Sequence, residues 1–387
     1  MEGIFAIGDV CTLKSGMSLP DDIMSANGEI PYIKVAELNW DENTPIITTS
    51  DKFVSKAMVG KKMIFPVGTV LFPKRGGAIG TNKKRVTSLP VCADLNIMGV
   101  IPGTTVQPKY LFYFFENVDM ALLYNGSSIP QINNTDIAPL KIRIPSLDKQ
   151  QTIVNILDKI STLIFLRKQQ LAKLDELVKA RFVEMFGDPV CNPYAWETAH
   201  LASLGNCKNG MNFHTADSGI EIYCLGVGDF HDLSVISDTA QLSKVSLNEM
   251  PSDDYLLMDE DIVFVRSNGN KALVGRSVVV YPHNTPTTFS GFCIRFRKNT
   301  ESLLTDYLLY VLKTNSIREK MAGRGANIQN LNQQILSELE IPMPPVSLQR
   351  EFSYFSTQTA KQKLTIQQSL DKLEVLKKAL MQEYFTI

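Results

Sequence analysis

The sequence of 387 residues has little net charge, no long apolar run and no export signal. Its 39 Lys and Arg residues are balanced by 40 Asp and Glu, which gives a net charge of −1, so any surface that binds nucleic acid must be local. No apolar segment approaches the roughly 20 residues that span a bilayer. The N-terminal residues Met1, Glu2 and Gly3 are not those of a secretory signal. These absences predict a soluble, cytoplasmic protein without a membrane segment.

Catalytic and metal-binding motifs are also missing. The six cysteines include no pair at the spacing of zinc or redox motifs, and the four histidines show no metal-binding spacing. The glycine-rich stretch 76–84 lacks the Gly-Lys-Ser/Thr that ends a phosphate-binding loop. The tripeptide 192–194, Asn-Pro-Tyr, is part of an adenine-methylase motif, but the second proline and an upstream donor-binding loop are absent, which favours a turn. We predict no catalytic residue, no metal site and reduced cysteines.

The strongest positive feature is an internal repeat. Residues 129–186 match residues 328–385 without a gap, at a constant shift of 199 positions that places Pro145 on Pro344 and Gln150 on Gln349. Looser matches lie upstream, where VLFPKRGGAIG (70–80) resembles IVFVRSNGNKALVG (262–275) and LKSGM (13–17) resembles CKNGM (207–211). The chain is therefore predicted to contain two copies of one unit, each with a variable part and a well-matched tail.

Each tail predicts a short strand followed by a long helix. The strands are LKIRIP (140–145) and LEIPMP (339–344), both closed by proline. In the first helix, expected over about 150–186, the spacing of apolar residues alternates between four and three, which is a heptad seam; these residues are 153, 157, 160, 164, 171, 174, 178 and 185. The second helix is expected to run to the C-terminus. One long helix alone would be equally typical of packing on its own domain, but two copies separated by a domain predict an antiparallel pair.

The variable parts read as mixed α/β. Runs such as 262–265, 277–281 and 292–297 are rich in β-branched and aromatic residues, and helices are expected over 110–124 and 306–321. The predicted fold class is α+β, with two α/β domains in pseudo-twofold repeat separated by two long antiparallel coiled-coil helices. The predicted boundaries are 1–145 for the first domain, 146–187 for the central helix, 188–344 for the second domain and 345–387 for the last helix.

Charge is segregated at matching places in the two repeats. No acidic residue lies between Asp51 and Asp94, where nine are basic, and none lies between Asp261 and Glu301, where six are basic. A single charge run is usually a solvated face, but two matching windows favour DNA, because phosphates repel carboxylates. Glycines in the windows allow close approach, and Arg, Lys and Asn can read base edges. The candidate DNA-binding residues are Lys61, Lys62, Lys74, Arg75, Asn82, Lys83, Lys84, Arg85, Arg266, Asn268, Asn270, Lys271, Arg276, Arg295 and Arg297.

Four segments resemble one family over essentially the whole chain. They are IPSLDKQQTIVNILDKI (144–160), LAKLDELVKARFVEMFGDP (171–189), NPYAW (192–196) and IPMPPVSLQREF (341–352). With the two-part repeat, they are similar to the specificity subunits of type I restriction-modification systems, which serve host defence. The resemblance implies two target-recognition domains, each reading half of a split double-stranded DNA site, with the paired helices as a spacer.

The resemblance also implies partners. These are two modification subunits that bind S-adenosylmethionine and methylate adenine, and restriction subunits that use ATP and Mg²⁺; this subunit itself would be non-catalytic and hold no cofactor. Candidate partner-binding residues on the helices are Leu163, Leu166, Leu171, Leu174, Leu177, Leu370, Leu373 and Leu376. Two other hypotheses stay open at this point. One is a scaffold that binds proteins and not DNA, which the acid-free windows disfavour, and the other is a fused methylase, which the missing motifs disfavour.

Overall fold

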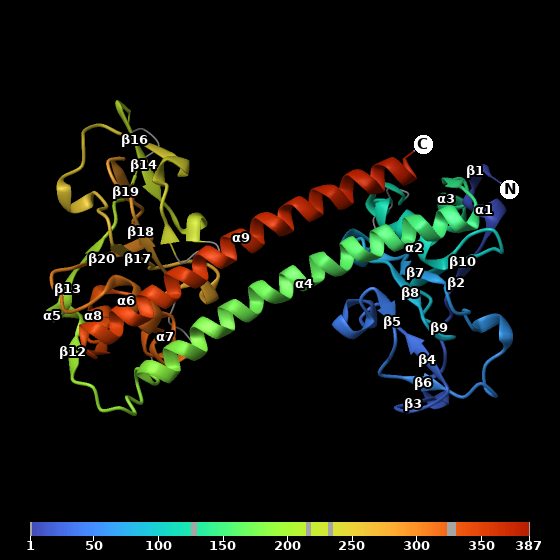
Figure 1. Cartoon of the computed structure of the whole chain (residues 1–387), viewed down its shortest axis with the longest axis horizontal. Coiled ribbons are helices and arrows are strands. Elements are labelled where there is room, and N and C mark those ends of the chain that lie inside the picture. Colours follow the sequence, from blue (N-terminus) through green and yellow to red (C-terminus); the bar gives the residue numbers. More distant parts are fainter. Residues whose placement is uncertain (1, 125–129, 214–217, 231–234, 323–329, 387) are drawn as a thin grey trace. The chain divides into compact units, whose positions relative to one another are not determined.

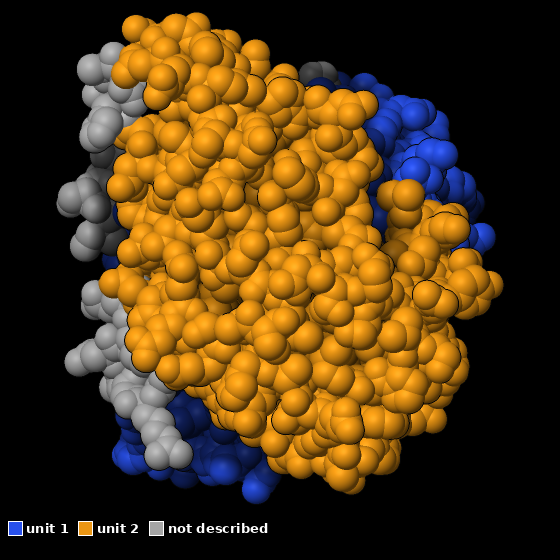
Figure 2. All heavy atoms as spheres, turned by 90° about the vertical axis from the view of Figure 1, so that its left-hand side faces the viewer, with its two compact units in different colours: residues 1–169, 366–387 blue, residues 170–365 orange. Residues whose placement is uncertain are grey.

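The computed structural model of the chain describes residues 2–124, 130–213, 218–230, 235–322 and 330–386 (Figure 1). The chain divides into two compact units. Unit 1 comprises residues 1–169 and 366–387, and unit 2 comprises residues 170–365; Figure 2 colours them blue and orange. The boundary differs from the four segments expected from the sequence, because each long helix is divided between the two units.

Unit 1 is built on two small sheets and a separate antiparallel pair of strands. The central sheet has the order β2-β10-β7-β8-β5, the second has the order β3-β6-β4-β9, and β1 pairs with β11. The strands are β1 (Gly3–Ala6), β2 (Cys11–Ser15), β3 (Met24–Ser25), β4 (Ile30–Ile33), β5 (Ile46–Ile47), β6 (Phe53–Val54), β7 (Val70–Pro73), β8 (Arg85–Thr87), β9 (Cys92–Ala93), β10 (Ile97–Pro102) and β11 (Lys141–Ile144).

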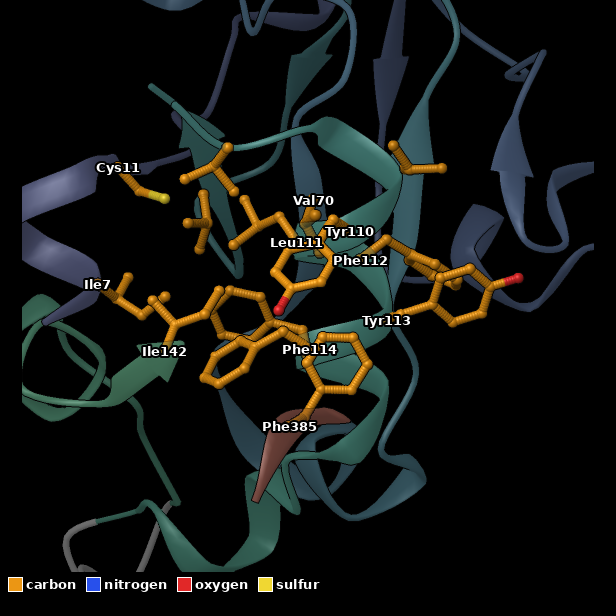
Figure 3. Close-up of a cluster of buried hydrophobic side chains, with 14 of the residues drawn as sticks. Ile7, Cys11, Val70, Tyr110, Leu111, Phe112, Tyr113, Phe114, Ile142 and Phe385 are labelled. Atoms are coloured by element: carbon orange, nitrogen blue, oxygen red, sulfur yellow. The ribbon is translucent and has the colours of Figure 1, made fainter. Parts of the chain in front are cut away.

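The helices of unit 1 are α1 (Ile7–Val10), α2 (Pro108–Asn117), α3 (Asn134–Ile137), the first part of α4 (Leu147–Phe186) and the last part of α9 (Val346–Phe385). Pro108 begins α2, where its fixed φ suits the first helical turn. The core lies between α2, the central sheet and the ends of the long helices. Tyr110, Phe114, Ile142 and Phe385 converge there (Figure 3).

Unit 2 repeats this plan. Its central sheet has the order β13-β20-β17-β18-β15, a smaller sheet has the order β16-β14-β19, and β12 pairs with β21. The strands are β12 (Thr198–His200), β13 (Gly205–Asn209), β14 (Ile220–Leu225), β15 (Val235–Ile236), β16 (Lys244–Leu247), β17 (Asp261–Val265), β18 (Ser277–Val280), β19 (Thr287–Phe289), β20 (Cys293–Lys298) and β21 (Glu340–Pro342). The helices are α5 (Leu201–Leu204), α6 (Thr305–Lys313), α7 (Asn315–Ala322), α8 (Gln333–Ser337) and the remaining parts of α4 and α9.

Strand registers show that the weaker upstream matches are structural equivalents. In unit 1, Val70 pairs with Val86 and Val100; in unit 2, Ile262 pairs with Val279 and Phe296. The well-matched tails are equivalent too, because the repeated glutamine has the same role in both. Gln150 and Gln349 are fully buried, and each donates to the carbonyl of a proline five residues earlier, at 2.9 Å. Each accepts from the backbone just ahead of α2 or α6, also at 2.9 Å, which fixes the start of the long helix.

The long helices are antiparallel where they meet within unit 2. Asp175 of α4 is paired with Lys363 of α9, and Arg181 further along α4 bonds the earlier Glu351, at 2.9 Å. The predicted seam of α4 is largely confirmed, since positions 153, 157, 160, 178 and 185 are buried and 164, 171 and 174 are partly buried. The repeated terminal phenylalanines dock on matching tyrosines. Phe385 lies 5.0 Å from Tyr110 in unit 1, and Phe186 lies 4.7 Å from Tyr307 in unit 2, measured between ring centroids.

Two predicted helices are shorter than expected. The helix expected over 110–124 ends at Asn117 and is followed by a separate 3₁₀ turn at Met120–Leu122. The helix expected over 306–321 is interrupted at Thr314, whose extended backbone separates α6 from α7. The Thr314 hydroxyl donates to the carbonyl of Val311 at 2.8 Å, a local bond that competes with the helical pattern.

Candidate nucleic-acid interface

Equivalent loops lie at one end of the central sheet in each unit. In unit 1 the loop follows β7, and in unit 2 it follows β17. We call these residues the rim: Lys74–Ala78, Asn96 and Gln131 in unit 1, and Arg266–Asn270, Phe292 and Asn330 in unit 2. An equivalent backbone bond fixes each loop: Lys74 donates to the carbonyl of Asn96, and Arg266 donates to the carbonyl of Phe292, both at 2.8 Å.

A second strand-like contact closes each rim. Arg75 forms an isolated antiparallel β-bridge with Gln131, and Ser267 forms the equivalent β-bridge with Asn330. The carbonyls of Lys74 and Arg266 accept from Ile132 and Leu331, at 2.9 and 2.8 Å. The matching geometry therefore places an amide side chain, Gln131 or Asn330, beside each basic loop. The sequence prediction missed both residues, although they lie in the gapless part of the repeat, because their segments contain no basic cluster.

The unit 1 rim surrounds a cavity of about 680 Å³ lined by Arg75, Gly76, Gly77, Asn96 and Gln131, among others. The Arg75 Nε donates to Gln131 Oε1 at 3.0 Å, and this bond uses one of the three guanidinium nitrogens. A Cβ added at Gly76 or Gly77 would meet no atom within 4 Å, so the backbone here is open to a ligand. Burial lowers the pKa of Lys74, whose Nζ donates to Ser15 Oγ at 2.7 Å. The rim thus presents donors and an amide at an uncrowded backbone.

The unit 2 rim has the same layout with other side chains. Arg266 Nη1 donates to the carbonyl of Gly291 at 3.2 Å. The loop is held by Asx turns, in which Asn268 Oδ1 accepts from the nitrogen of Asn270 at 2.7 Å, and Asn270 accepts from Ala272 at 3.1 Å. Phe292 is 61% exposed beside this loop. The side chain of Lys271 lies outside the described residues. The two rims therefore offer different chemistry on one scaffold.

Glycines at the ends of β2 and β13 explain the repeated Gly-Met dipeptide. A Cβ on Gly16 would lie 2.1 Å from the carbonyl oxygen of Asp94, and one on Gly210 would lie 2.1 Å from that of Ser290. No other residue fits where backbone approaches this closely. The similarity between residues 13–17 and 207–211 thus reflects a packing requirement next to each rim.

Four predicted DNA-binding residues are buried or half-buried and bonded inside the units. Arg295 is 2% exposed and donates to Asn206 Oδ1 at 2.9 Å. Arg297 makes two bonds to the buried Asp261, at 2.8 and 2.7 Å. Lys84 is 4% exposed and donates to the carbonyl of Val118 at 2.7 Å, and Arg85 is 8% exposed. These four side chains make contacts inside the units; direct contacts from them to a duplex stay a prediction.

The remaining candidates lie at or near the surface. Lys61, Lys62, Arg75, Asn82 and Asn270 are exposed; Lys74, Lys83, Arg266, Asn268 and Arg276 are partly exposed. Asn82 Oδ1 also accepts from the backbone of Met120 at 2.9 Å, and Lys83 donates to Asn39 Oδ1 at 2.6 Å. DNA contacts by these residues stay a prediction.

Comparison with known proteins identifies the family. A family model described as the type I restriction modification DNA specificity domain matches residues 2–176 and again residues 194–375. The chain belongs to this family. It is accordingly a DNA sequence-recognition subunit, and the two matches coincide with the two copies of the internal repeat.

Individual relatives of this specificity subunit agree. The type I restriction enzyme StySPI specificity subunit of Salmonella potsdam is 24% identical over 371 residues, covering 89% of this chain and 79% of the relative. The putative MjaX specificity subunit of Methanocaldococcus jannaschii is 29% identical over 282 residues, 66% and 62% of the two chains. The S subunit structure from M. genitalium superposes with a TM-score of 0.59 at 14% identity, covering 100% of this chain and 96% of that one, which supports the α/β fold with two long helices.

Among the described residues, no group of three or more His, Cys, Asp or Glu side chains is arranged to hold a metal ion. Within the same ranges, no helix is both long enough and apolar enough to cross a membrane.

Proposed function

We propose that each unit of this specificity subunit reads one half of a bipartite DNA site through its rim. The observation that carries the proposal is the equivalence of the two rims. Equivalent backbone bonds hold Lys74 in unit 1 and Arg266 in unit 2. Equivalent β-bridges place Gln131 and Asn330 beside these two loops. Arginine and amide side chains are the groups that read guanine and adenine in the major groove. The two rims carry different side chains, as the reading of two different half-sites requires.

Phosphate contacts would come from exposed lysines of unit 1 outside the rim. Lys61 and Lys62 lie on an exposed 3₁₀ turn, Lys61–Met63, where neither side chain is engaged by a carboxylate in the described structure. Each phosphate neutralised releases counterions and contributes about 0.9 to the slope of log affinity against log salt. Replacing both lysines by Gln should therefore lower that slope by up to about 2 while the sequence read stays the same.

The rim is tested by methylome sequencing of cells that express the subunit with its modification partner. The variant Arg75→Gln with Gln131→Ala should change only the half-site read by unit 1, and Asn268→Ala should change only the other. Lys56→Gln removes an exposed charge from the same acid-free window outside the rim and serves as the control. A change in both half-sites from a single-unit variant, or none from either, would contradict the proposal.

The chain itself would direct partner subunits and perform no chemistry. Methylation of adenine with S-adenosylmethionine, and ATP-dependent cleavage with Mg²⁺, would belong to the modification and restriction subunits. The purified chain should then neither methylate nor cut DNA, and activity should appear only when the partners are added. Adenine methylation by the chain alone would refute this assignment.

The long helices would provide the docking surface for the modification subunits. In unit 1, Leu163, Phe165 and Leu166 of α4 are 45, 58 and 46% exposed, and Val375 of α9 is 69% exposed. Of the residues predicted from sequence, Leu177 and Leu376 are also exposed, Leu171, Leu174 and Leu373 are partly buried, and Leu370 is buried. Charged substitutions at Phe165 and Leu166 should abolish co-purification with the modification subunit, whereas a substitution at the neighbouring Gln169 should not.

A further inference from the structure

A second cavity in unit 1 is lined by several cations, some of them buried or half-buried. Its volume is about 580 Å³, and it is lined by the segment 82–85, the end of α2, and the parts of α4 and α9 that belong to unit 1. Six cationic side chains line it: Lys83, Lys84, Arg85, Lys168, Lys377 and Lys378. We call this cavity the basic pocket.

The carboxylates of the basic pocket balance only part of this charge. Glu374 is paired with Lys168 at 2.8 Å, and Glu116 is paired with Lys377 at 3.0 Å. In the described part of the chain, Lys83, Lys84, Arg85 and Lys378 take part in no salt bridge. Two carboxylates therefore face six cations, and the pocket carries a local excess of positive charge.

Two of the unpaired cations are buried, which is costly without a counter-charge. Lys84 donates to Asn82 Oδ1 and to the carbonyl of Val118, at 2.6 and 2.7 Å, and burial lowers its pKa to about 8. Arg85 Nη1 donates to the carbonyl of Lys84 at 2.8 Å, and burial lowers its pKa as well. The Arg85 Nε is buried and has no hydrogen-bond partner within the described structure.

The fold does not need these cations. Strand β8 of unit 1 corresponds to β18 of unit 2, since Leu71 pairs with Arg85 as Val263 pairs with Val278. Unit 2 therefore has Val278 where unit 1 has Arg85, and Ser277 where unit 1 has Lys84. The gapless repeat also places the buried Val178 at the position of Lys377. The same strand and helix form with neutral residues, so the charge in unit 1 serves something other than folding.

We propose that the basic pocket binds a phosphate group. Arginine and several lysines around one small cavity match the charge and acceptor oxygens of phosphate. The position also fits. The 3₁₀ segment Gly76–Thr81 has six residues; it begins in the unit 1 rim and ends next to Asn82, the first residue of the pocket. Such a segment is about 12 Å long at 2.0 Å per residue, or three to four nucleotide steps of one strand.

The phosphate can come from two sources with the same chemistry: the backbone of bound DNA or a free phosphate ion. The DNA source rests on the proposed function, because it requires a duplex at the unit 1 rim. Both sources predict that an anion binds near Lys83 and Lys378, which are the accessible pocket cations that no carboxylate engages in the described structure.

The first arm of the test uses inorganic phosphate and the full chain without DNA. Thermal unfolding is followed in phosphate and in chloride at equal ionic strength and pH. The variant Lys83→Gln with Lys378→Gln keeps the buried Lys84 and Arg85 in place, and its melting in chloride reports whether it folds. The matched control, Lys62→Gln with Lys372→Gln, removes two exposed charges of unit 1 that do not line the pocket. Wild type and control should gain melting temperature in phosphate, and the pocket variant should lose most of that gain.

The second arm uses duplexes that carry one neutral methylphosphonate in place of a phosphate, moved step by step along the site. If the DNA backbone occupies the pocket, one position should weaken binding of wild type and control about tenfold and leave the pocket variant unaffected. A phosphate-dependent rise in melting temperature without such a position identifies free phosphate as the ligand. If neither response differs between wild type and pocket variant, the proposal is wrong. Rim variants that leave the sequence read unchanged, while the phosphate response persists, would instead contradict the proposed function alone.

Discussion

Replacing Phe385 by Ala should destabilise unit 1 and leave unit 2 intact. Phe385 is the last helical residue of α9 and is 5% exposed, with its ring centroid 5.0 Å from that of Tyr110 and 6.3 Å from that of Phe114 (Figure 3). Removing a buried phenylalanine costs about 3–5 kcal/mol, from lost burial and the cavity that remains. For a unit of this size that corresponds to a fall in melting temperature of roughly 6–20 °C.

The equivalent change in unit 2 provides the comparison. Phe186 packs on Tyr307 and Phe352, at centroid distances of 4.7 and 5.6 Å, so Phe186→Ala should cost a similar amount there. Hydrogen exchange read by mass spectrometry on the full chain locates each effect. Phe385→Ala should remove protection from α2, and Phe186→Ala from α6, whereas the exposed Glu383→Ala should change neither. Loss of protection in α6 with Phe385→Ala, or equal loss in both helices, would refute the assignment of each helix end to its unit.

Three further predictions concern charge and helix length. Asp261→Asn removes the carboxylate that Arg297 contacts at 2.7 Å and should lower the unfolding free energy in urea by about 3–5 kcal/mol; a loss below about 1 kcal/mol would contradict a buried pair. Because burial lowers the pKa of Lys84 to about 8, the unfolded chain binds the extra proton between that pH and the ordinary lysine value, so this group favours folding increasingly as pH rises. Lys84→Met should therefore reduce the gain in stability between about pH 7 and pH 9 in phosphate-free buffer, and an unchanged gain would contradict the lowered pKa. Four residues inserted in both helices, after 169 and after 365, add about 6 Å to each and should lengthen the unspecified DNA spacer by one or two base pairs in the methylome; an active complex with the original spacer would show that the helices do not set it.

The sequence predicted those features that depend on periodicity and repetition. A constant shift of 199 residues identified two equivalent units, and the structure gives Gln150 and Gln349 the same contacts. The heptad seam of α4 predicted its buried face, because helical spacing alone decides which side chains share a face. The strands 262–265 and 277–281 were also predicted, since they are short runs of β-branched residues between turns.

The roles of individual charged residues could not be predicted in this way. Arg297 is bonded to Asp261, which lies 36 residues earlier, and Lys84 is bonded to the carbonyl of Val118, which lies 34 residues later. Such contacts depend on the tertiary fold and leave no local pattern. Gln131 was missed for the same reason, since it reaches Arg75 only through a bridge between distant segments. The division of each long helix between two units also has no local signal.

The division of the chain into units has a consequence for its synthesis. Unit 2 is continuous, residues 170–365, but unit 1 needs residues 366–387 as well as the first 169. On the ribosome, domains generally fold in the order in which they emerge. Here unit 1 is completed only when the end of α9 arrives, because Phe385 covers part of the apolar surface around Tyr110 and Phe114. The N-terminal unit is thus the last to be completed, and a transcript cut short near its end would leave that surface open to aggregation although only a few residues were lost.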